Sequence, residues 1–289
     1  MPEQDWTEGF RAGYAAGFSD GFRAAREALS SGELAPAAVP HKHVAKKRYG
    51  TATVTGKQQL SVDMIRVFAQ APDMVGLSLD KTDHYIKIFF GEQTRSYTLR
   101  KVDTATGEIA IDFFFHGDVG VAGPWARDVH VGETFSYKGP GGKWSPTTPL
   151  PGVQEFVFAG DESAAPAIAC GLERIPAGAS ATAYVEVAAP GHEIPMPEGS
   201  SVVWLYREGK PAGQALVDAL REHNVKHART AWFVRGPSSI VKDARRYLFR
   251  ERGVAKQDAS ISGYWKNRRR TPYLVCYLTP RLSPHLLCI

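Results

Sequence analysis

Hydrophobic and polar residues alternate in a series of short segments in the first half of the chain. Five short segments between residues 47 and 150 are rich in β-branched and aromatic residues, and turn residues separate them. These segments are SVDMIRVFAQ, DHYIKIFF, TRSYTLRKV, EIAIDFFFHG and ETFSYKG. A period of two is typical of strands with one buried face. Several such strands without helical segments between them predict a small antiparallel β-barrel.

The second half of the chain alternates between strand-like and helix-like segments. The predicted strands are QEFVFAG, ATAYVEVA, SVVWLYRE and RTAWFVRG, and the predicted helices are DESAAPAIACGLERI, AGQALVDALREHN and PSSIVKDARRYLFRERG. This alternation is typical of a parallel sheet with helical crossovers. The fold class we expect is β + α/β, with an N-terminal antiparallel β-barrel followed by a parallel-sheet α/β domain.

These patterns divide the chain into four regions. We expect a Gly/aromatic N-terminal extension at residues 1–46, the barrel domain at 47–150, the α/β domain at 151–265 and a basic C-terminal tail at 266–289. The segment KGPGGKWSPTTPLPG contains four prolines, so we interpret it as a linker between the two domains.

The N-terminal extension carries an aromatic residue at every fourth position, with a glycine before each. The aromatic residues are Phe10, Tyr14, Phe18 and Phe22. On a helix they would form a stripe, but each glycine costs a helix about 1 kcal/mol relative to alanine. Two interpretations stay open: a loosely ordered extension that docks its rings on a partner surface, and a specific oligomerisation or lipid-surface helix.

Composition and charge exclude several classes of protein. The chain has 289 residues, 43% of them hydrophobic, and a net charge of +5. All of this excess lies from Lys266 onward, where five basic residues and no acid occur, so the remainder is neutral and does not resemble a nucleic-acid-binding surface. No apolar run approaches the roughly 20 residues of a membrane helix, and the first residues lack a secretory signal. The cysteines Cys170, Cys276 and Cys288 form no CxxC pair. We therefore expect a cytoplasmic protein with no metal site, no nucleic-acid partner and no integral membrane segment.

A barrel followed by a nucleotide-type α/β domain is similar to the layout of flavin reductases, in which the barrel holds the flavin. In that layout the stretch TRSYTLR could bind the flavin nucleotide. The fork of Arg95 could bind a phosphate bidentately. The ring of Tyr97 could stack on a flavin, and the hydroxyl of Thr98 could reach a ring nitrogen. On an ideal strand this ring and this hydroxyl point to opposite faces, so we expect a local twist or bulge here.

The segment IDFFFHGDVGVAGPWA resembles a signature of the siderophore-interacting proteins, which are FAD-dependent ferric-siderophore reductases of a ferredoxin-reductase-like type. That signature is a strand ending in histidine and glycine, followed by G-P-A-S-x-W-A. The residues that match are His116, Gly117, Gly120, Ala122, Trp125 and Ala126. Val121 replaces the proline and Gly123 the serine. The segments TDHYIKIFF and TRSYTLRKVD look like the barrel of that family, GDESAAPAI resembles its G-D-E-T-A-x-P-A-I, and GYWKN resembles its G-Y-W-R-x-G.

The resemblance covers residues 47–265 and implies an FAD site in the barrel. The diphosphate would lie at Arg95 and at Gly120–Ala126, a small-residue turn that lets backbone N–H groups approach an anion. The full set of cofactor-binding residues it implies is Arg95, Ser96, Tyr97, Thr98, Asp112, His116, Gly120, Ala122, Gly123, Trp125 and Ala126. Trp125 has an equally good interpretation as a core anchor. A structural role is favoured for His116, because hydride transfer needs no proton shuttle.

The resemblance also implies a site for a nicotinamide dinucleotide in the α/β domain. The residues are Gly160, Asp161, Glu162, Ser163 and Gly236, at positions where parallel strands give way to helices and N–H groups meet phosphates. Asp161 and Ser163 have an alternative interpretation as helix caps. The family has A-G-E where this chain has Arg235, Gly236 and Pro237, so the loss of that acid is expected to alter the binding of the nucleotide.

The predicted function is that of an FAD-dependent ferric-siderophore reductase. NADPH, NADH or a ferredoxin-type protein would supply electrons, chelated Fe(III) would be reduced and Fe(II) released, with the flavin and no catalytic side chain carrying the chemistry. A basic rim of Lys87, Lys266 and Arg268 would attract the anionic ferric siderophore, although each has a simpler interpretation as a solvated surface residue. Two alternatives stay open: a flavin-binding interaction or electron-transfer module without nicotinamide turnover, and a general flavin oxidoreductase with another acceptor.

Overall fold

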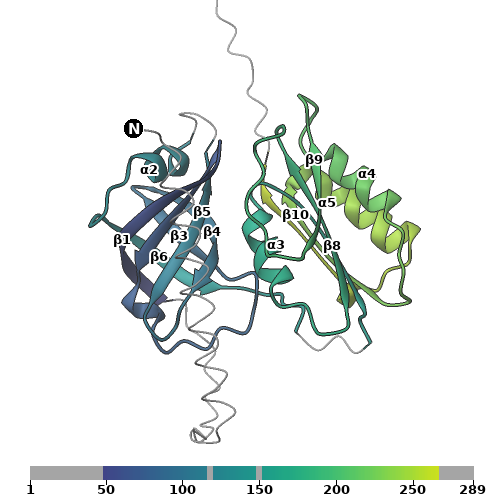
Figure 1. The fold of residues 1–289 in the computed structure, drawn as a ribbon, viewed down its shortest axis with the longest axis horizontal. Coiled ribbons are helices and arrows are strands. Elements are labelled where there is room, and N and C mark those ends of the chain that lie inside the picture. The colour runs from purple at the N-terminus through teal and green to yellow at the C-terminus, as the bar shows by residue number, and fades with distance from the viewer. Residues whose placement is uncertain (1–47, 116–119, 148–151, 267–289) are drawn as a thin grey trace, which may run out of the picture. The chain divides into compact units, whose positions relative to one another are not determined.

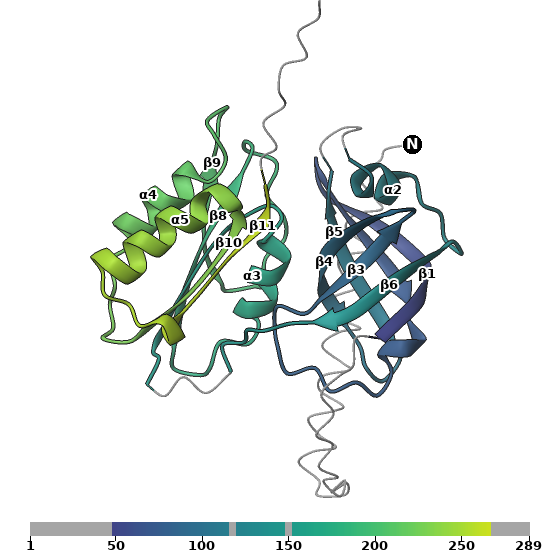
Figure 2. The same ribbon diagram turned by 180° about the vertical axis from the view of Figure 1, so that it is seen from behind.

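The computed structural model describes residues 48–115, 120–147 and 152–266 of the chain. These residues form a β-barrel followed by a sheet with helices (Figures 1 and 2). The predicted N-terminal extension and the tail beyond Lys266 lie outside the described residues. No helix in the described ranges is both long enough and apolar enough to span a membrane.

The first domain is a closed barrel with the strand order β1-β2-β5-β4-β3-β6, in which all neighbouring strands are antiparallel. Its strands are β1 (Arg48–Ser61), β2 (Met64–Gln70), β3 (Tyr85–Phe90), β4 (Gln93–Val102), β5 (Glu108–Phe114) and β6 (Thr134–Gly141). The short helices are η1 (Pro72–Met74) and α2 (Ala122–Asp128). The sequence analysis did not select β1, although Ala52 and Val54 of this strand are buried between exposed threonines. Closure pairs both edges of the sheet.

The second domain is a sheet of parallel strands with the order β11-β10-β7-β8-β9. Its strands are β7 (Glu155–Asp161), β8 (Ser180–Val187), β9 (Ser201–Tyr206), β10 (Thr230–Pro237) and β11 (Ala259–Trp265). Its helices are α3 (Ala165–Leu172), α4 (Gln214–Glu222), α5 (Ser238–Arg245), the π-helical η2 (Arg246–Glu251) and the 3-10 turn η3 (Lys256–Asp258). The predicted fold class is therefore confirmed.

Helices cover both faces of this sheet. Figures 1 and 2 show α4 and α5 side by side on one face and α3 on the other. The central strands β7 and β10 are consequently buried along their whole length, as expected for parallel strands between two helical layers. After β7 the chain continues to β8, which pairs with one side of β7, and it later returns to β10, which pairs with the other side of β7. The carboxyl ends of β7 and β10 therefore form the topological switch point, where open α/β sheets bind ligands.

The predicted linker after β6 is only partly a linker. Asp83, in the loop before β3, accepts hydrogen bonds of 2.7 Å from the backbone N–H groups of both Lys143 and Trp144. The Trp144 ring then packs on Phe158 and Phe233 of the sheet, with centroid distances of 5.5 and 4.5 Å. The prolines and glycines indicated a linker correctly in type, but the tryptophan between them anchors the segment through its buried apolar area.

Candidate functional site

Strand β4 carries Arg95, the predicted phosphate contact, near its start. Arg95 is exposed, and its guanidinium bonds only to its own strand, at 2.6 Å to Gln93 Oε1 and 3.0 Å to the Thr94 carbonyl. In the part of the chain that the structure describes, no carboxylate pairs with Arg95. Ser96 next to it is exposed as well. A guanidinium without an acid is a donor suited to a phosphate, whereas Ser96, the next residue of the strand, points to the opposite face.

Tyr97 and Thr98 point to opposite sides of β4, as an ideal strand requires. The Tyr97 ring packs toward the barrel interior on Phe113, with a centroid distance of 4.3 Å, and burial raises the pKa of Tyr97 to about 12. Thr98 is buried on the other side, where it is a neighbour of Tyr264 at the end of β11. The expected bulge does not occur at Tyr97 and Thr98, because the pairing with β3 is regular there. A register shift occurs beyond it, after Leu99, in the pairing with β5.

The predicted small-residue turn is in large part a helix. Gly120 is exposed with a φ of +87°, but the chain then forms α2, in which Ala122, Gly123 and Ala126 are buried. A Cβ at Gly123 would lie 3.3 Å from the Phe115 backbone. These residues are therefore small because α2 packs closely on the barrel. His116 lies outside the described residues.

Trp125 is an anchor of the barrel core. Its ring contacts Phe90, Phe113 and Phe135, each with a centroid distance of 5.4 Å and steeply inclined planes. Such edge-to-face contacts are favourable for aromatic rings. Of the two interpretations left open by the sequence, the structure therefore supports the core anchor.

Asp112 has a partner within the barrel. Its carboxylate accepts two parallel hydrogen bonds from Arg66 on the adjacent strand, at 2.6 and 2.8 Å, and the two residues face each other in the register of β2 and β5. The Asp112 side chain is fully buried. Its predicted role in cofactor binding would have to coexist with this ion pair.

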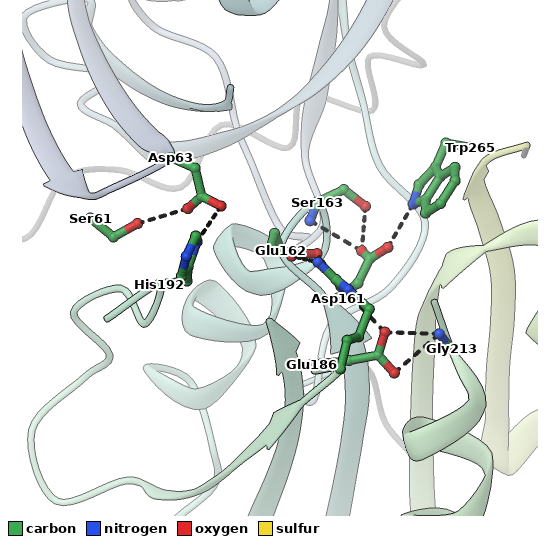
Figure 3. A network of polar contacts seen from close by, with 10 residues as sticks. Ser61, Asp63, Asp161, Glu162, Ser163, Glu186, His192, Gly213 and Trp265 are labelled. Atoms are coloured by element: carbon green, nitrogen blue, oxygen red, sulfur yellow. Dashed lines mark hydrogen bonds and ion pairs between the residues drawn. The ribbon is translucent and has the colours of Figure 1, made fainter. Parts of the chain in front are cut away.

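The residues predicted to bind a dinucleotide meet at the switch point (Figure 3). Asp161, at the end of β7, accepts hydrogen bonds from Ser163 Oγ at 2.5 Å and from Trp265 Nε1 at 2.6 Å. Desolvation raises the pKa of Asp161 to about 6, although both hydrogen bonds oppose this shift. Gly236, at the end of β10, lies beside it, since an added Cβ would be 3.4 Å from Asp161 Cγ. Gly160 allows α3 to start close to β7, because its Cβ would be 2.5 Å from that of Ala164.

A second polar cluster lies along the same edge (Figure 3). It contains Glu162, which the sequence predicted for the dinucleotide site, and three residues that the sequence did not indicate, Arg207, Glu186 and Gly213. Arg207, directly after β9, forms a bidentate ion pair with Glu162, and its Nη1 also lies 3.3 Å from Glu186 Oε1. Glu186 accepts two further hydrogen bonds from the Gly213 N–H, at 2.8 and 3.1 Å. Burial raises the pKa of Glu186, while these donors oppose the shift. The signal in the sequence that could have indicated this cluster is the glutamate inside the mostly apolar segment ATAYVEVA.

Arg235, where the family motif has alanine, is a buried structural residue. It donates to the Ser260 carbonyl at 2.7 Å and to Ser260 Oγ at 2.9 Å, and it lies 3.4 Å from Asp83 Oδ2 of the barrel. Its guanidinium carbon stacks 3.9 Å from the centre of the Phe233 ring. This departure therefore ties β10 to β11 and to the barrel.

Two of the predicted substrate residues are described, and both are exposed. Lys87 lies on β3 opposite Ser96 of β4, and Lys266 follows β11. No contact between them is recorded, and Arg268 lies outside the described residues. Within the described ranges, no three histidine, cysteine or acidic side chains are grouped as a metal site would require.

Comparison with known proteins agrees with this arrangement. Residues 153–268 match the model of the siderophore-interacting protein family, and residues 91–144 match that of the siderophore-interacting FAD-binding domain. The second match supports FAD as the cofactor, and the exposed Arg95, which has no carboxylate partner among the described residues, is compatible with it.

Several individual proteins are similar to this chain. An uncharacterized protein of Mycobacterium tuberculosis is 40% identical over 195 residues, which are 61% of this chain and 65% of that protein. The ferric vibriobactin reductase ViuB of Vibrio cholerae is 28% identical over 237 residues, 73% of this chain and 86% of that protein. The crystal structure of a siderophore utilization protein from T. fusca is 28% identical, has a TM-score of 0.68, and the match covers 78% of this chain and 95% of that one.

The match with the mycobacterial relative spans 65% of that protein's length. The family itself rests on the two model matches, on the barrel-and-sheet fold and on the similarity to the T. fusca structure. The chain belongs to the siderophore-interacting protein family.

Proposed function

We propose that this protein is an FAD-dependent reductase that uses a reduced nicotinamide dinucleotide to reduce the iron of a ferric siderophore, in the cytoplasm. The observation that carries the proposal is the exposed guanidinium of Arg95, without a carboxylate partner in the described chain, inside the segment that matches an FAD-binding domain. An arginine left unpaired on a strand is poorly explained by the stability of the barrel, because its own contacts are local and exposed.

The chain's residues would hold FAD as follows. Arg95 and Ser96 would bind its diphosphate, and the backbone at the exposed Gly120 would be a further contact. Thr98, on the side of β4 that faces Tyr264, would donate to its ring system, whereas Tyr97 lies on the opposite side of the strand and would support the position of β4 through its contact with Phe113. When bound, FAD accepts hydride from a reduced nicotinamide and passes single electrons to ferric iron. The protein supplies position and electrostatics.

The donor would bind at the switch point. Gly160, Ser163 and Gly236 surround the carboxyl ends of β7 and β10, which is where dinucleotides lie in open α/β sheets. The substrate class is supported by the similarity to a protein named ferric vibriobactin reductase. Lys87 and Lys266 would attract an anionic ferric chelate. Oxygen-rich chelators bind Fe(II) less tightly than Fe(III), so reduction would release the iron.

A second candidate is a flavin-binding electron-transfer module that takes electrons from a ferredoxin-type protein. It is favoured by Pro237, which stands where the family has an acid, and by the buried Arg235 beside it. One experiment separates the two. The purified protein is titrated anaerobically with NADH and NADPH while the flavin absorbance is recorded, and a ferric catecholate or hydroxamate siderophore is then added.

The proposed reductase is expected to be yellow, to lose its flavin absorbance with at least one dinucleotide, and to regain it with the ferric siderophore. Protein that is yellow but does not react with either dinucleotide, and is reduced by a ferredoxin, would support the second candidate. Protein that binds no FAD would contradict both.

A further inference from the structure

The carboxyl edge of β7, β8 and β9 carries Arg207, whose terminal guanidinium nitrogens already donate hydrogen bonds to two carboxylates. Arg207 directs both terminal nitrogens at Glu162, and one of them also at Glu186. The side chains of Glu162 and Glu186 are 5% and 0% exposed, while that of Arg207 is 15% exposed. Glu186 is fixed further by the Gly213 N–H just before α4. The guanidinium fork is therefore held inside the edge and is not directed at a ligand.

The charges of this cluster do not balance. Two carboxylates share one guanidinium, and burial weakens the screening that water would provide. The turn after β9 adds Glu208 and Lys210, both exposed, whose charges offset each other. The edge as a whole keeps an excess of negative charge.

The position of the cluster determines what this charge does. In the first βαβ unit of a dinucleotide-binding sheet, the end of the second strand lies at the adenosine ribose. An acid there suits the free 2′-hydroxyl, whereas an available arginine accommodates a 2′-phosphate. Here the second strand is β8, and Glu186 is its penultimate residue. A 2′-phosphate placed at this edge would meet the excess carboxylate. The exposed Lys210 in the turn after β9 would offset this repulsion little, because exposed ion pairs contribute little.

We propose that Glu162 and Glu186, by holding Arg207 between them, make this protein select NADH over NADPH. This inference rests on the proposed function, in which a reduced nicotinamide dinucleotide is the donor. It assigns the choice between NADH and NADPH to Glu162, Glu186 and Arg207. Asp161 and Gly236 keep their proposed place at the nicotinamide end of the same edge.

The test compares ligands that differ only by the phosphate in question. Full-length protein with bound FAD is titrated calorimetrically with 5′-AMP and with 2′,5′-ADP, and the flavin is reduced anaerobically with NADH and NADPH over a range of concentrations. We expect both pairs to favour the ligand without the 2′-phosphate by about tenfold or more. In Glu162→Gln and in Glu186→Gln the preference is expected to fall about tenfold, because each removes one carboxylate from the edge.

Glu222→Gln is the matched control, since it removes the same charge at the other end of α4. It should leave the preference unchanged. Melting temperature and FAD content establish that each variant is folded; if Glu186→Gln does not fold, Glu162→Gln decides. Equal or tighter binding of NADPH by the wild type would overturn the inference and leave the proposed function intact. Failure of both dinucleotides to bind or to reduce the flavin would overturn the proposed donor, and this inference with it.

Discussion

Trp265 Nε1 donates a 2.6 Å hydrogen bond to Asp161 Oδ2, and this bond joins the ends of β11 and β7 across β10. Gly236 of β10 lies beside the Asp161 carboxylate, since an added Cβ would be 3.4 Å from Asp161 Cγ. The carboxylate is almost fully buried, and no cation pairs with it in the described chain. Hydrogen bonds alone therefore offset its desolvation, and they do so incompletely.

The buried Asp161 predicts an unusual pH dependence of stability. Its pKa of about 6 in the folded protein lies above the ordinary aspartate value of 3.8, so the folded state binds the proton more tightly than the unfolded state. The resulting stabilisation of the protonated form is present below pH 3.8 and is lost as the pH rises to 6. Ionisation at neutral pH then costs about 3 kcal/mol, at 1.36 kcal/mol per pKa unit.

Asp161→Asn cannot ionise, so its free energy of unfolding relative to the wild type should rise by up to about 3 kcal/mol between pH 4 and pH 7.5. Urea unfolding at a series of pH values measures this difference. Asp218→Asn, on the exposed side of α4, is the control and should follow the wild type. A difference between Asp161→Asn and the wild type that does not change with pH would contradict the assignment.

The sequence was sufficient for the architecture because its signals are local. Alternation identified most barrel strands, and buried apolar runs identified the strands of the parallel sheet. The helix α2 was missed because its stability comes from packing Ala122, Gly123 and Ala126 on the barrel, which no local pattern records. Strand β1 was missed because its exposed positions are small and polar.

The site was predicted only in part, for a similar reason. The motifs placed Arg95–Thr98 and Gly160–Ser163 correctly on β4 and at the end of β7. The pairing of Arg207 with Glu162 joins residues 45 apart, and that of His192 Nδ1 with Asp63 Oδ2, at 2.6 Å, joins residues 129 apart (Figure 3). Such contacts depend on the strand order and on the docking of a loop, and neither is encoded by spacing along the chain.

Arg95 should be the strongest single contact to FAD. A hydrogen bond to a charged group contributes about 1.5–3 kcal/mol, so Arg95→Ala is expected to raise the FAD dissociation constant roughly 10- to 150-fold. Equilibrium dialysis or flavin fluorescence on reconstituted protein measures this value. Arg250→Ala removes an exposed arginine in η2 and should not alter it. Unchanged FAD affinity in Arg95→Ala would show that the diphosphate binds elsewhere.

The ion pair of Arg66 and Asp112 predicts a stability defect that a second substitution repairs. Asp112→Ala leaves the largely buried guanidinium of Arg66 without its partner, which costs about 3 kcal/mol or more. Replacing both residues, as in Arg66→Met with Asp112→Leu, should recover most of this loss, and chemical denaturation of the single and double variants measures the coupling.

The same double variant tests the predicted role of Asp112 in cofactor binding. If Asp112 acts only through Arg66, the double variant should bind FAD as the wild type does. A folded double variant with weakened FAD binding, beside an Arg66→Met single variant that binds FAD normally, would show that the carboxylate itself contacts the cofactor. A double variant no more stable than Asp112→Ala would show that the ion pair is not what stabilises this part of the barrel.

Gly160 connects packing to the donor site. An added Cβ would lie 2.5 Å from Ala164 Cβ and 3.1 Å from Ile168 Cδ1. The Ala164 Cβ is fixed to the backbone and cannot move without displacing the start of α3. Gly160→Ala should therefore cost about 1–3 kcal/mol, as overpacking does, and raise the KM for the dinucleotide by shifting the start of α3. Gly56→Ala is the control, because its Cβ would make an ordinary contact of 3.7 Å with Phe68. Thermal unfolding and flavin-reduction kinetics of both variants measure the stability and the KM. A Gly160→Ala protein that is as stable as Gly56→Ala and has an unchanged KM would show that α3 does not need to approach β7 this closely.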